Sequence, residues 1–384
     1  MTEAGGGLVR PDLRTPRNWK WGSVPPDVLP LWLADMDLPP PPAVREGLAA
    51  LARDGWLGYE MVPGDAALRE SVRRWLAARG HPGLADPLEL VLGPGVLPLL
   101  YAAVRAHVPP GGAVVVPTPA YPPFFSAARD QDRRVVEVPM READGRVVLD
   151  VERIAAALAA GARAVLLCQP HNPTGRVFTR DELAAVAEAA ARFDAVLLAD
   201  EVWADLWYDA PPLPVAAASD AAAERTLTIV GPCKSYNIAG LPIGAAVSAA
   251  PELLAPLVRL GYGLGHPGQG PVAMWDLALR VAQPWLEATR ATLRARRDRV
   301  VPALAELGVA VRSPEATYLA WLDGRRHPLG DRLAATILEH GRVLLNDGRH
   351  FGAGGAACAR LNFATTDDVL DEALARLRRV LAAS

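Results

Sequence analysis

Lysine is almost missing from this chain of 384 residues: among its 40 basic residues only Lys20 and Lys234 are lysines, and the others are arginines. Cysteine is scarce too, and Cys168, Cys233 and Cys358 show no CxxC spacing, which argues against a disulfide framework or a zinc site. So few cysteines fit a reducing cytoplasm. The sequence also has no signal-peptide pattern at its start and no run of about 20 apolar residues that could span a bilayer.

Charge of either sign is modest. The net charge is −3, and 22% of the residues are charged while 51% are hydrophobic. Slight acidity with dispersed arginines argues against nucleic acid as the main partner. This composition, over this length, indicates a globular protein with one large and one smaller domain around well-buried cores. We therefore expect a cytoplasmic protein with no membrane span, no metal centre and no nucleic-acid partner.

The residue pattern changes along the chain. A Pro- and Gly-rich arm at the N-terminus is followed by two amphipathic helices, and from residue 88 short apolar strands alternate with helices. The expected helices are 43–54, 66–80, 97–108, 122–130, 151–161 and 181–193, and the expected strands are 88–92, 113–117, 134–138, 163–168, 195–200 and 226–230. Continuous apolar strands between helices are typical of a mostly parallel sheet that is covered on both faces and binds ligands at its carboxyl end.

The pattern changes again after about residue 280. The expected elements there are a long Arg-rich helix at 285–308, strands at 309–313, 317–322, 342–346 and 358–364, and a closing helix at 367–382. The sequence therefore predicts an arm at 1–45 that forms part of the small domain, a large α/β domain at 46–280 and a small α+β domain at 281–384.

Lys234 stands out because it lies in an apolar, Gly-rich stretch, GPCKSYNIAGLPIG, directly after an expected strand. Arginine stays protonated and cannot form an imine, whereas a desolvated lysine loses its proton more easily and becomes a nucleophile. The alternative is an exposed lysine in an ordinary turn. The residue type and its surroundings alone do not decide between these two interpretations.

Three other polar groups follow expected strands. Gly93-Pro94-Gly95 ends one strand and begins a helix, so its backbone N–H groups could hold a phosphate. Asp200 and Glu201 end another strand, where a buried carboxylate must pair with a cation or a metal. Asn172 follows a third strand and could offer its amide to a ligand. Each could also be an ordinary turn, but four such groups at one sheet edge predict a single crevice that binds a phosphorylated cofactor.

Eight segments carry a family resemblance, in the family's order: LPLWLADMDL, GYE, GPGVLPLL, PTPAYPPFF, PHNPTGRVF, ADEVWADL, CKSYNIAGL and ARLNFA. On these segments the chain resembles the fold-type I enzymes of the class I/II aminotransferase superfamily, which depend on pyridoxal 5′-phosphate (PLP). WLADMD and AYPPFF resemble the cystathionine β-lyase, or C–S lyase (MalY/PatB-type), subgroup. The resemblance implies an α/β PLP-dependent transferase fold of type I, with a mostly parallel seven-stranded sheet sandwiched by helices and a small α+β terminal domain.

The resemblance also implies roles for individual residues. Lys234 would be the Schiff-base lysine, Asp200 the partner of the pyridine nitrogen and Arg360 the clamp on the substrate carboxylate. Ala34 and Asp35 would lie near the substrate, in a segment that could also be merely structural. The other residues expected at the cofactor are Asn172, Tyr121, Gly95, Val96, Leu97, Tyr59, Trp203 and Cys233, and Asn172 and Tyr121 are also expected at the substrate. Tyr59 would reach a neighbouring subunit, which implies a homodimer. Taken singly, Tyr121 also fits an aromatic core position and Tyr59 a surface turn.

Three positions depart from the family pattern. Trp203 stands where Tyr or His is usual, Cys233 where many relatives have Ser, and Pro242 where a basic residue often holds the phosphate. The implied activity is a C–S β-lyase that converts a cysteine S-conjugate to thiol, pyruvate and ammonia. An aminotransferase, or an oxidative or decarboxylating PLP enzyme, is the alternative. A PLP-containing regulator would need a DNA-binding domain before the fold, and the arm leaves no room for one.

Overall fold

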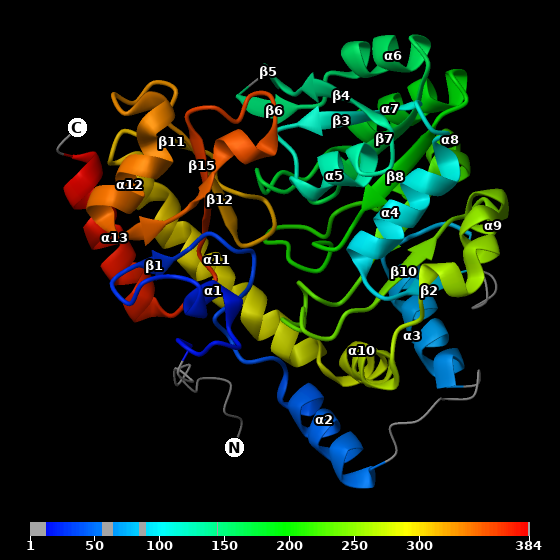
Figure 1. Cartoon of the computed structure of the whole chain (residues 1–384), viewed down its shortest axis with the longest axis horizontal. Helices are drawn as coiled ribbons and strands as arrows, with labels where there is room; N and C mark the ends of the chain where they lie inside the picture. The colour runs from blue at the N-terminus through cyan, green and yellow to red at the C-terminus, as the bar shows by residue number, and fades with distance from the viewer. Residues whose placement is uncertain (1–12, 56–63, 84–89, 144, 383–384) are drawn as a thin grey trace.

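The computed structural model describes residues 13–55, 64–83, 90–143 and 145–382, and its centre is a seven-stranded sheet (Figure 1). The strand order is β2 (Leu90–Gly93), β10 (Gly244–Val247), β9 (Thr226–Val230), β8 (Val196–Asp200), β7 (Ala162–Cys168), β3 (Ala113–Thr118) and β4 (Arg134–Pro139). β10 is antiparallel to both of its neighbours, and the pairs from β9 to β4 are all parallel. The mostly parallel seven-stranded sheet expected from the family resemblance is confirmed.

Strand β10 has no counterpart among the strands expected from the residue pattern. Its sequence, Gly-Ala-Ala-Val, lacks the β-branched and aromatic run that marks the other strands. Small residues are needed here, because a Cβ on Gly244 would lie 3.0 Å from the Val230 carbonyl oxygen and 3.1 Å from the Gly95 carbonyl carbon. Close packing therefore selected residues that local propensity does not favour in a strand.

Helices cover both faces of the sheet (Figure 1). They are α4 (Val96–His107), α5 (Pro123–Arg129), α6 (Val151–Ala159), α7 (Arg180–Arg192), α8 (Asp220–Arg225) and α9 (Pro251–Leu260). Along β3, Val114 and Val116 belong to one hydrophobic cluster with Leu99 of α4, whereas Val115 belongs to another with Leu183 of α7. This alternation shows that both faces of the strand are buried in separate cores.

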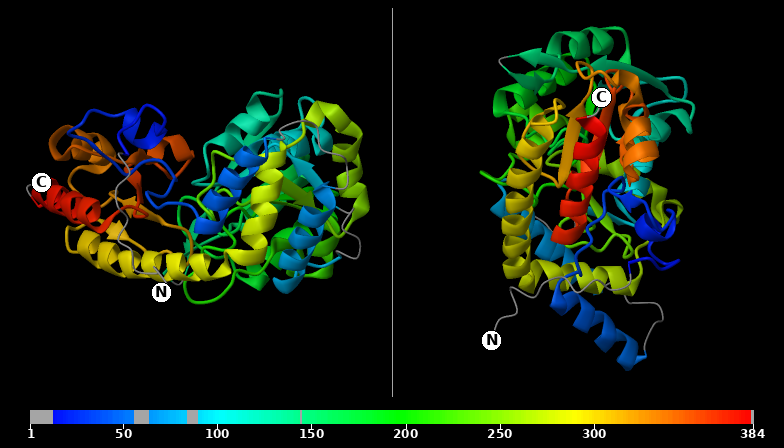
Figure 2. Two further views of the ribbon diagram at one scale, coloured as in Figure 1. Left: turned by 90° about the horizontal axis from the view of Figure 1, so that it is seen from below. Right: turned by 90° about the vertical axis from the view of Figure 1, so that its left-hand side faces the viewer.

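A second sheet of four strands lies beside the first. Its order is β11 (Ala310–Val311), β12 (Leu319–Asp323), β15 (Cys358–Asn362) and β14 (Asn346–Asp347), and its neighbouring helices are α11 (Gln283–Ala305), α12 (Leu333–Gly341) and α13 (Asp367–Leu381). Figure 2 shows α11, in yellow, beside α13 and meeting α10 (Gln269–Val281) at its N-terminal end.

The strand expected at 342–346 is two strands that join different sheets. β13 (Val343–Leu344) pairs in parallel with β1 (Leu29–Pro30), whereas β14 pairs with β15. The sequence pattern cannot show this division, because a short apolar run such as VLL carries no sign of which strand it pairs with. The β1–β13 pair attaches the N-terminal segment to the C-terminal part of the chain.

The remaining elements are α1 (Trp19–Gly22), α2 (Pro42–Asp54), α3 (Gly64–Ala78), β5 (Arg141–Ala143) and β6 (Arg146–Val148), with short 3₁₀ turns at Val215–Ala217, Gly261–Leu264, Gly330–Arg332 and Gly348–Phe351.

Candidate active site at the carboxyl edge of the large sheet

The predicted site residues gather where three neighbouring parallel strands end. Asp200 is the last residue of β8, Asn172 follows the end of β7 by four residues, and Lys234 follows the end of β9 by four. The strands are in register, because Cys168 pairs with Asp200 and Asp200 pairs with Ile229. One edge of the sheet therefore presents a carboxylate, an amide and an amine side by side.

The Lys234 amine lies against the backbone of the N-terminal segment. Its Nζ donates to the Ala34 carbonyl oxygen at 2.7 Å, and the same oxygen accepts from the Tyr318 hydroxyl at 3.0 Å. Nζ also lies 5.6 Å from the centroid of the Trp203 ring, which meets the Tyr318 ring edge-on at 4.8 Å. Two buried aromatic rings and one carbonyl therefore fix where the amine stands, and the indole replaces a polar partner with its π face.

Asp200 is buried at the end of its strand, and its Oδ1 accepts from the Val202 N–H at 3.1 Å. Burial raises the pKa of its carboxyl to about 6, because the Val202 N–H and the nearby Lys234 cation only partly offset the lost solvation. Among the residues that the structure describes, no cation forms an ion pair with it. Asp200 is thus a buried carboxylate whose position favours a cationic ligand.

Arg360 lies on β15 of the small sheet and reaches into the same edge. Its Nη1 donates to Asn172 Oδ1 at 2.9 Å and its Nη2 to the Trp32 carbonyl oxygen at 2.8 Å, while its buried Nε has no partner within the described chain. Burial lowers the pKa of this guanidinium to about 10, and none of the described carboxylates pairs with it. A buried cation of this kind is a site for an anion.

Gly95 forms the turn before α4 with a φ of +130°, a conformation that glycine adopts without strain. It is the N-cap residue, so the N–H groups of Val96 and Leu97 open the helix without intrahelical partners. A Cβ at Gly95 would stand 3.8 Å from Pro242, which places that proline beside the turn. Since proline has no N–H, it adds no donor to this anion site.

Tyr121 and Cys233 complete the described part of the expected cofactor site. Burial and the nearby Asp200 carboxylate raise the pKa of Tyr121 to about 12, so its hydroxyl stays protonated. Burial likewise raises the pKa of the Cys233 thiol, against the opposing charge of Lys234, so Cys233 is no thiolate at neutral pH. Tyr59, which is expected to reach a neighbouring subunit, lies outside the described residues.

The sequence analysis gave no role to Tyr318 or to the residue before it. Thr317 is a fully buried β-branched residue at a φ of +70°, and its N–H donates to the Leu206 carbonyl oxygen at 2.6 Å. Unusual backbone conformations of this kind are common at functional sites, where the surrounding structure holds them. Thr317 therefore helps to position Tyr318 beside the Lys234 amine. No local motif marks Tyr318, because its contact with Ala34 spans 284 residues of sequence.

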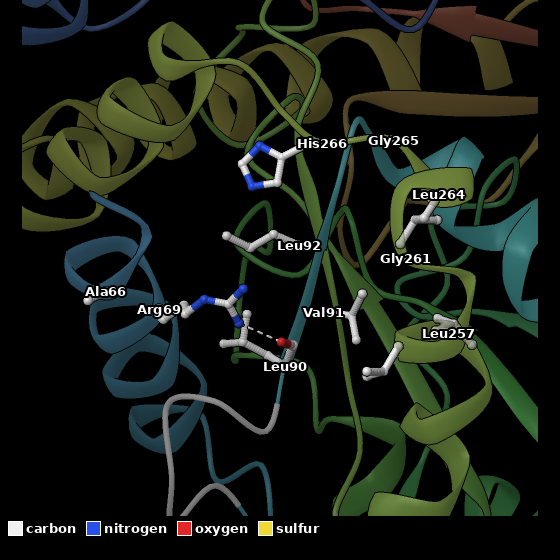
Figure 3. A pocket seen from close by; sticks show the side chains of 11 residues that line it. Ala66, Arg69, Leu90, Val91, Leu92, Leu257, Gly261, Leu264, Gly265 and His266 are labelled. Atoms are coloured by element: carbon white, nitrogen blue, oxygen red, sulfur yellow. Dashed lines mark hydrogen bonds between the residues drawn. The ribbon is translucent and has the colours of Figure 1, made fainter. Parts of the chain in front are cut away.

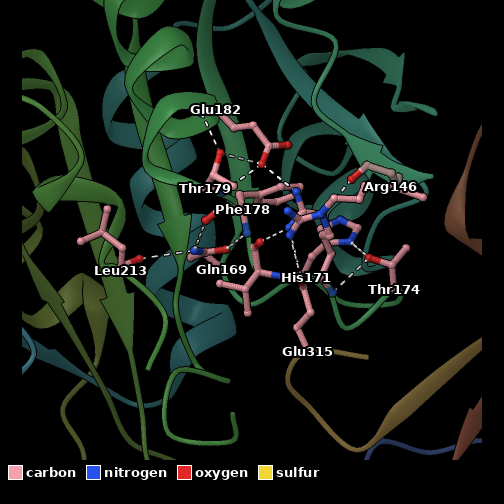
Figure 4. Close-up of polar contacts among 12 residues, drawn as sticks. Arg146, Gln169, His171, Thr174, Phe178, Thr179, Glu182, Leu213 and Glu315 are labelled. Carbon is pink, nitrogen blue, oxygen red and sulfur yellow. Dashed lines mark hydrogen bonds and ion pairs between the residues drawn. The ribbon is translucent and has the colours of Figure 1, made fainter. Parts of the chain in front are cut away.

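A network of polar contacts fixes the segment that carries Asn172, and Figure 4 shows part of it around Glu182, Thr179 and Glu315. Arg176 pairs with Glu182 of α7 at 2.7 Å and with Glu315 at 3.0 Å. The Gly175 carbonyl oxygen accepts from the Glu315 and Ala316 N–H groups, at 2.9 Å and 3.0 Å. The Asn172 turn and the chain entering Tyr318 are therefore tied together. His171 packs within this turn, with Nδ1 2.8 Å from Thr174 Oγ1, and burial lowers its pKa to about 3.

A second buried network lies behind the lysine turn. Ser235 Oγ donates to Asp205 Oδ2 at 2.9 Å, and Asp205 Oδ1 accepts from Trp75 Nε1 at 3.0 Å and from Arg79 at 3.3 Å. Glu201, fully buried, pairs with Arg79 at 3.7 Å, yet burial raises the pKa of its carboxyl to about 7. These contacts anchor the residue after Lys234 to helix α3.

Comparison with known families then decides which family this is. The family model for class I and II aminotransferases matches residues 26–377, which include every described site residue. The chain belongs to the aminotransferase class I and II family. Within the family it is 32% identical over 376 residues to a cystathionine β-lyase of Corynebacterium glutamicum, with 96% of this chain and 98% of the relative covered.

Two further proteins that resemble the chain bear on its reaction and its cofactor. A protein named as a probable N-succinyldiaminopimelate aminotransferase of Mycobacterium tuberculosis is 36% identical over 360 residues, covering 88% of each chain. The crystal structure of cystalysin from Treponema denticola, which contains a PLP cofactor, superposes with a TM-score of 0.87 at 25% identity and covers 100% of this chain and 98% of that one. The chain is thus similar over most of its length to a cystathionine β-lyase, to cystalysin and to a probable aminotransferase.

Two cavities of this class I and II aminotransferase family member lie away from the strand ends described above. One, of about 620 Å³, is mostly apolar and lies between α3, β2 and α9, with His266 and Arg69 at its edge (Figure 3). The other, of about 510 Å³, lies between the two sheets and includes Trp321. Neither is lined by Lys234, Asp200 or Arg360. The described residues also contain no cluster of potential metal ligands and no helix that could cross a membrane.

Proposed function

We propose that this enzyme is a PLP-dependent C–S β-lyase, which cleaves a cysteine S-conjugate to a thiol, pyruvate and ammonia. The observation that carries the proposal is the convergence of an amine, an unpaired buried carboxylate and an unpaired buried guanidinium at one sheet edge: Lys234, Asp200 and Arg360. The cystathionine β-lyase, which aligns with 96% of the chain, supports the same reaction, and the PLP in cystalysin supports the cofactor.

The residues present fit PLP. The buried Asp200 carboxylate, with no ion-pair partner in the described chain, would hold the protonated pyridine nitrogen, and the helix N-terminus at Gly95, Val96 and Leu97 would hold the phosphate. Tyr121, Asn172, Trp203 and Cys233 would line the ring. When bound, PLP draws electrons from Cα of the amino acid and so makes the Cα proton removable.

The protein side chains supply binding and proton transfer. Arg360 would hold the substrate carboxylate with its forked guanidinium, which Asn172 and the Trp32 carbonyl already orient. The Lys234 amine would then remove the Cα proton as a general base. The contacts of Nζ with the Ala34 carbonyl and the Trp203 ring support a fixed position for this base while the amine is not bonded to the cofactor.

The deciding experiment uses purified enzyme with PLP and S-ethyl-L-cysteine or cystathionine, first without and then with a 2-oxo acid. We expect thiol and pyruvate to appear in equal amounts without the 2-oxo acid. Strict dependence on the 2-oxo acid would instead establish an aminotransferase, the activity for which the Mycobacterium tuberculosis relative is named.

The matched variants use the only two lysines of the chain. Lys234→Ala should abolish both product formation and the visible absorption of the bound cofactor. Lys20→Arg should keep the visible absorption, because the Lys20 amine is already engaged in a buried ion pair with Asp37 at 2.9 Å and in a hydrogen bond to the Asp35 carbonyl oxygen at 3.1 Å. Loss of the band in Lys20→Arg and its survival in Lys234→Ala would refute the assignment.

The proposed enzyme acts as a homodimer in the cytoplasm, with Tyr59 of each subunit reaching the other subunit's phosphate. The division of the chain into an arm at 1–45, a large domain at 46–280 and a small domain at 281–384 is proposed in the same way. Sedimentation of the purified protein would test the dimer, and a monomeric holoenzyme with full activity would exclude a shared site.

A further inference from the structure

Asp35 lies in a segment whose backbone is held firmly beside the Lys234 amine. Its N–H donates to the Leu33 carbonyl oxygen at 2.9 Å, and its own carbonyl oxygen accepts from Lys20 Nζ at 3.1 Å and from Asn362 Nδ2 at 2.7 Å. The preceding carbonyl, that of Ala34, is the acceptor for Lys234. The backbone of Asp35 is thus held by contacts with three parts of the fold.

The Asp35 carboxyl, in contrast, has no hydrogen bond and no ion pair within the described chain, although it is half-buried. Asp37, two residues later, shows what a structural carboxylate in this segment looks like. Its Oδ2 pairs with Lys20 at 2.9 Å and its Oδ1 accepts from Trp21 Nε1 at 2.7 Å. Of these two acids, Asp37 has structural partners within the fold, whereas the side chain of Asp35 has none within the described chain.

The Asp35 carboxyl belongs to the residue next to Ala34, whose carbonyl oxygen holds the Lys234 amine. Burial raises the pKa of this carboxyl, and the charges that act on it most are the Lys234 cation first, then the Lys20 cation, which both lower it, and the Asp37 carboxylate, which raises it. Asp35 in turn raises the pKa of Tyr318, whose hydroxyl shares the Ala34 carbonyl with Lys234. Asp35 is therefore a half-buried acid one residue from the carbonyl that binds both Lys234 and Tyr318, and it lies within the electrostatic influence of both.

We propose that Asp35 is the proton donor to the leaving sulfur, an inference that rests on the proposed lyase function. A thiolate leaves less readily than chloride, because thiols are weak acids (the cysteine thiol has a pKa of about 8.5), so protonation at sulfur assists cleavage. The other candidates are weaker acids or are already engaged: Lys234 takes the Cα proton, and the pKa values of Tyr121 and Tyr318 are raised.

The step balances without a further reactant. Lys234 takes the Cα proton, and the electron pair of that C–H bond becomes the Cα–Cβ double bond. The Cβ–S bond breaks with its electron pair on sulfur, while the O–H bond of Asp35 breaks and an S–H bond forms. Lys234 ends with one proton more and Asp35 with one fewer, and both exchange protons with water because both side chains are only half-buried.

The test compares two substrates that differ in their need for a proton. S-ethyl-L-cysteine releases a thiolate, whereas β-chloro-L-alanine releases chloride, which leaves without protonation. In Asp35→Asn, we expect the ratio of kcat/KM for S-ethyl-L-cysteine to that for β-chloro-L-alanine to fall roughly 100-fold, the scale of general acid catalysis. Asp35→Glu keeps the acid and should restore much of the ratio.

Asp37→Asn is the matched control. It breaks the ion pair with Lys20, so both turnovers should fall together and their ratio should stay that of the wild type. An unchanged ratio in Asp35→Asn would overturn the proposal. Cystathionine is assayed as a third substrate, and a loss of activity confined to it would also overturn the proposal, because Asp35 would then be a partner of that substrate's distal ammonium. A wild-type enzyme that eliminates from neither substrate would refute the lyase function itself, and the Asp35 role with it.

A readout independent of turnover follows from the same position. A carboxyl whose pKa is raised on folding destabilises the folded state above its unfolded pKa of about 3.9. Asp35→Asn should therefore raise the Tm of the holoenzyme at pH 7, and the gain should disappear near pH 4. A Tm that falls at both pH values would show that the carboxylate is a structural group and would overturn the proposal.

Discussion

At the scale of single residues, Arg360 shows how a buried charge can be left for a ligand. Its two Nη atoms are held by Asn172 and by the Trp32 carbonyl, neither of which neutralises it. The cost of burying the guanidinium is therefore offset only when an anion arrives, and this makes affinity for a carboxylate large. Lysine at this position would keep the charge but lose the fork that those two acceptors orient.

We predict that Arg360→Lys raises KM for the amino-acid substrate by roughly 10- to 100-fold while the visible cofactor band is kept, because a charge-assisted fork contributes about 1.5–3 kcal/mol. The matched control is Arg349→Lys, which removes an exposed fork to Asp347 and should leave KM unchanged. Kinetics with S-ethyl-L-cysteine and absorption spectra would check both. A lower kcat with an unchanged KM would show that Arg360 does not bind the substrate carboxylate.

The same scale shows what a sequence can and cannot predict. Lys234, Asp200 and Asn172 were found because each ends or closely follows an apolar strand, and parallel strands bring their carboxyl ends together. Tyr318 was given no role and Asp35 was placed only near the substrate, because their importance comes from contacts across the fold rather than from neighbours in sequence. A buried charge without a partner is visible only once the partners of all other charges are known.

At the scale of elements, the strongly patterned strands and helices were predicted and the exceptions have specific causes. β10 is made of small residues because it is squeezed between β2, β9 and the Gly95 turn. β13 and β14 were expected as one strand, since nothing in RVLLN marks the change of partner. Tertiary packing decided both cases, and local propensity carries no information about it.

The turn at Gly175 provides a prediction at this scale, because it ties the Asn172 segment to the chain entering Tyr318. A Cβ at Gly175 would stand 2.3 Å from Pro314 Cβ, and the residue has a φ of +67°. Gly175→Ala should lower stability by roughly 1–2 kcal/mol for the left-handed backbone, with a further 1–3 kcal/mol for the overlap. It should also weaken substrate binding, because the overlap pushes the two segments apart.

Gly111→Ala is the matched control for this change. Gly111 has a similar φ of +74°, but a Cβ there would meet nothing within 4 Å. Only the backbone cost should remain, so the difference in free energy of unfolding between the two variants measures the close approach alone. Equal losses in urea unfolding would mean that the contact with Pro314 relaxes freely and that Gly175 does not couple the two segments.

At the scale of the whole molecule, buried ionisable groups oppose one another in the dependence of stability on pH. Burial lowers the pKa of His171 to about 3 and that of His81 to about 4, so stability is lost on acidification below about 6.5, the unfolded value. Burial raises the pKa of Asp200 to about 6 and that of Glu201 to about 7, so stability is lost as the pH rises towards those values. Between pH 5 and 6 the two pairs largely cancel.

Removing one of the four groups should reveal how the opposing pair changes the free energy of unfolding with pH. In Glu201→Gln, the folded state no longer takes up a proton that the unfolded state has released, so the free energy of unfolding relative to wild type should rise by about 1.4 kcal/mol per pH unit between pH 5 and 7. Loss of the Glu201–Arg79 ion pair should add an offset to this free energy that does not vary with pH, because Asp205 still pairs with Arg79 at 3.3 Å. Glu188→Gln, an exposed substitution on α7, should give a flat difference. Urea unfolding at several pH values would measure these differences, and a flat difference for Glu201→Gln would mean that Arg79 already holds the Glu201 carboxylate ionised across that range.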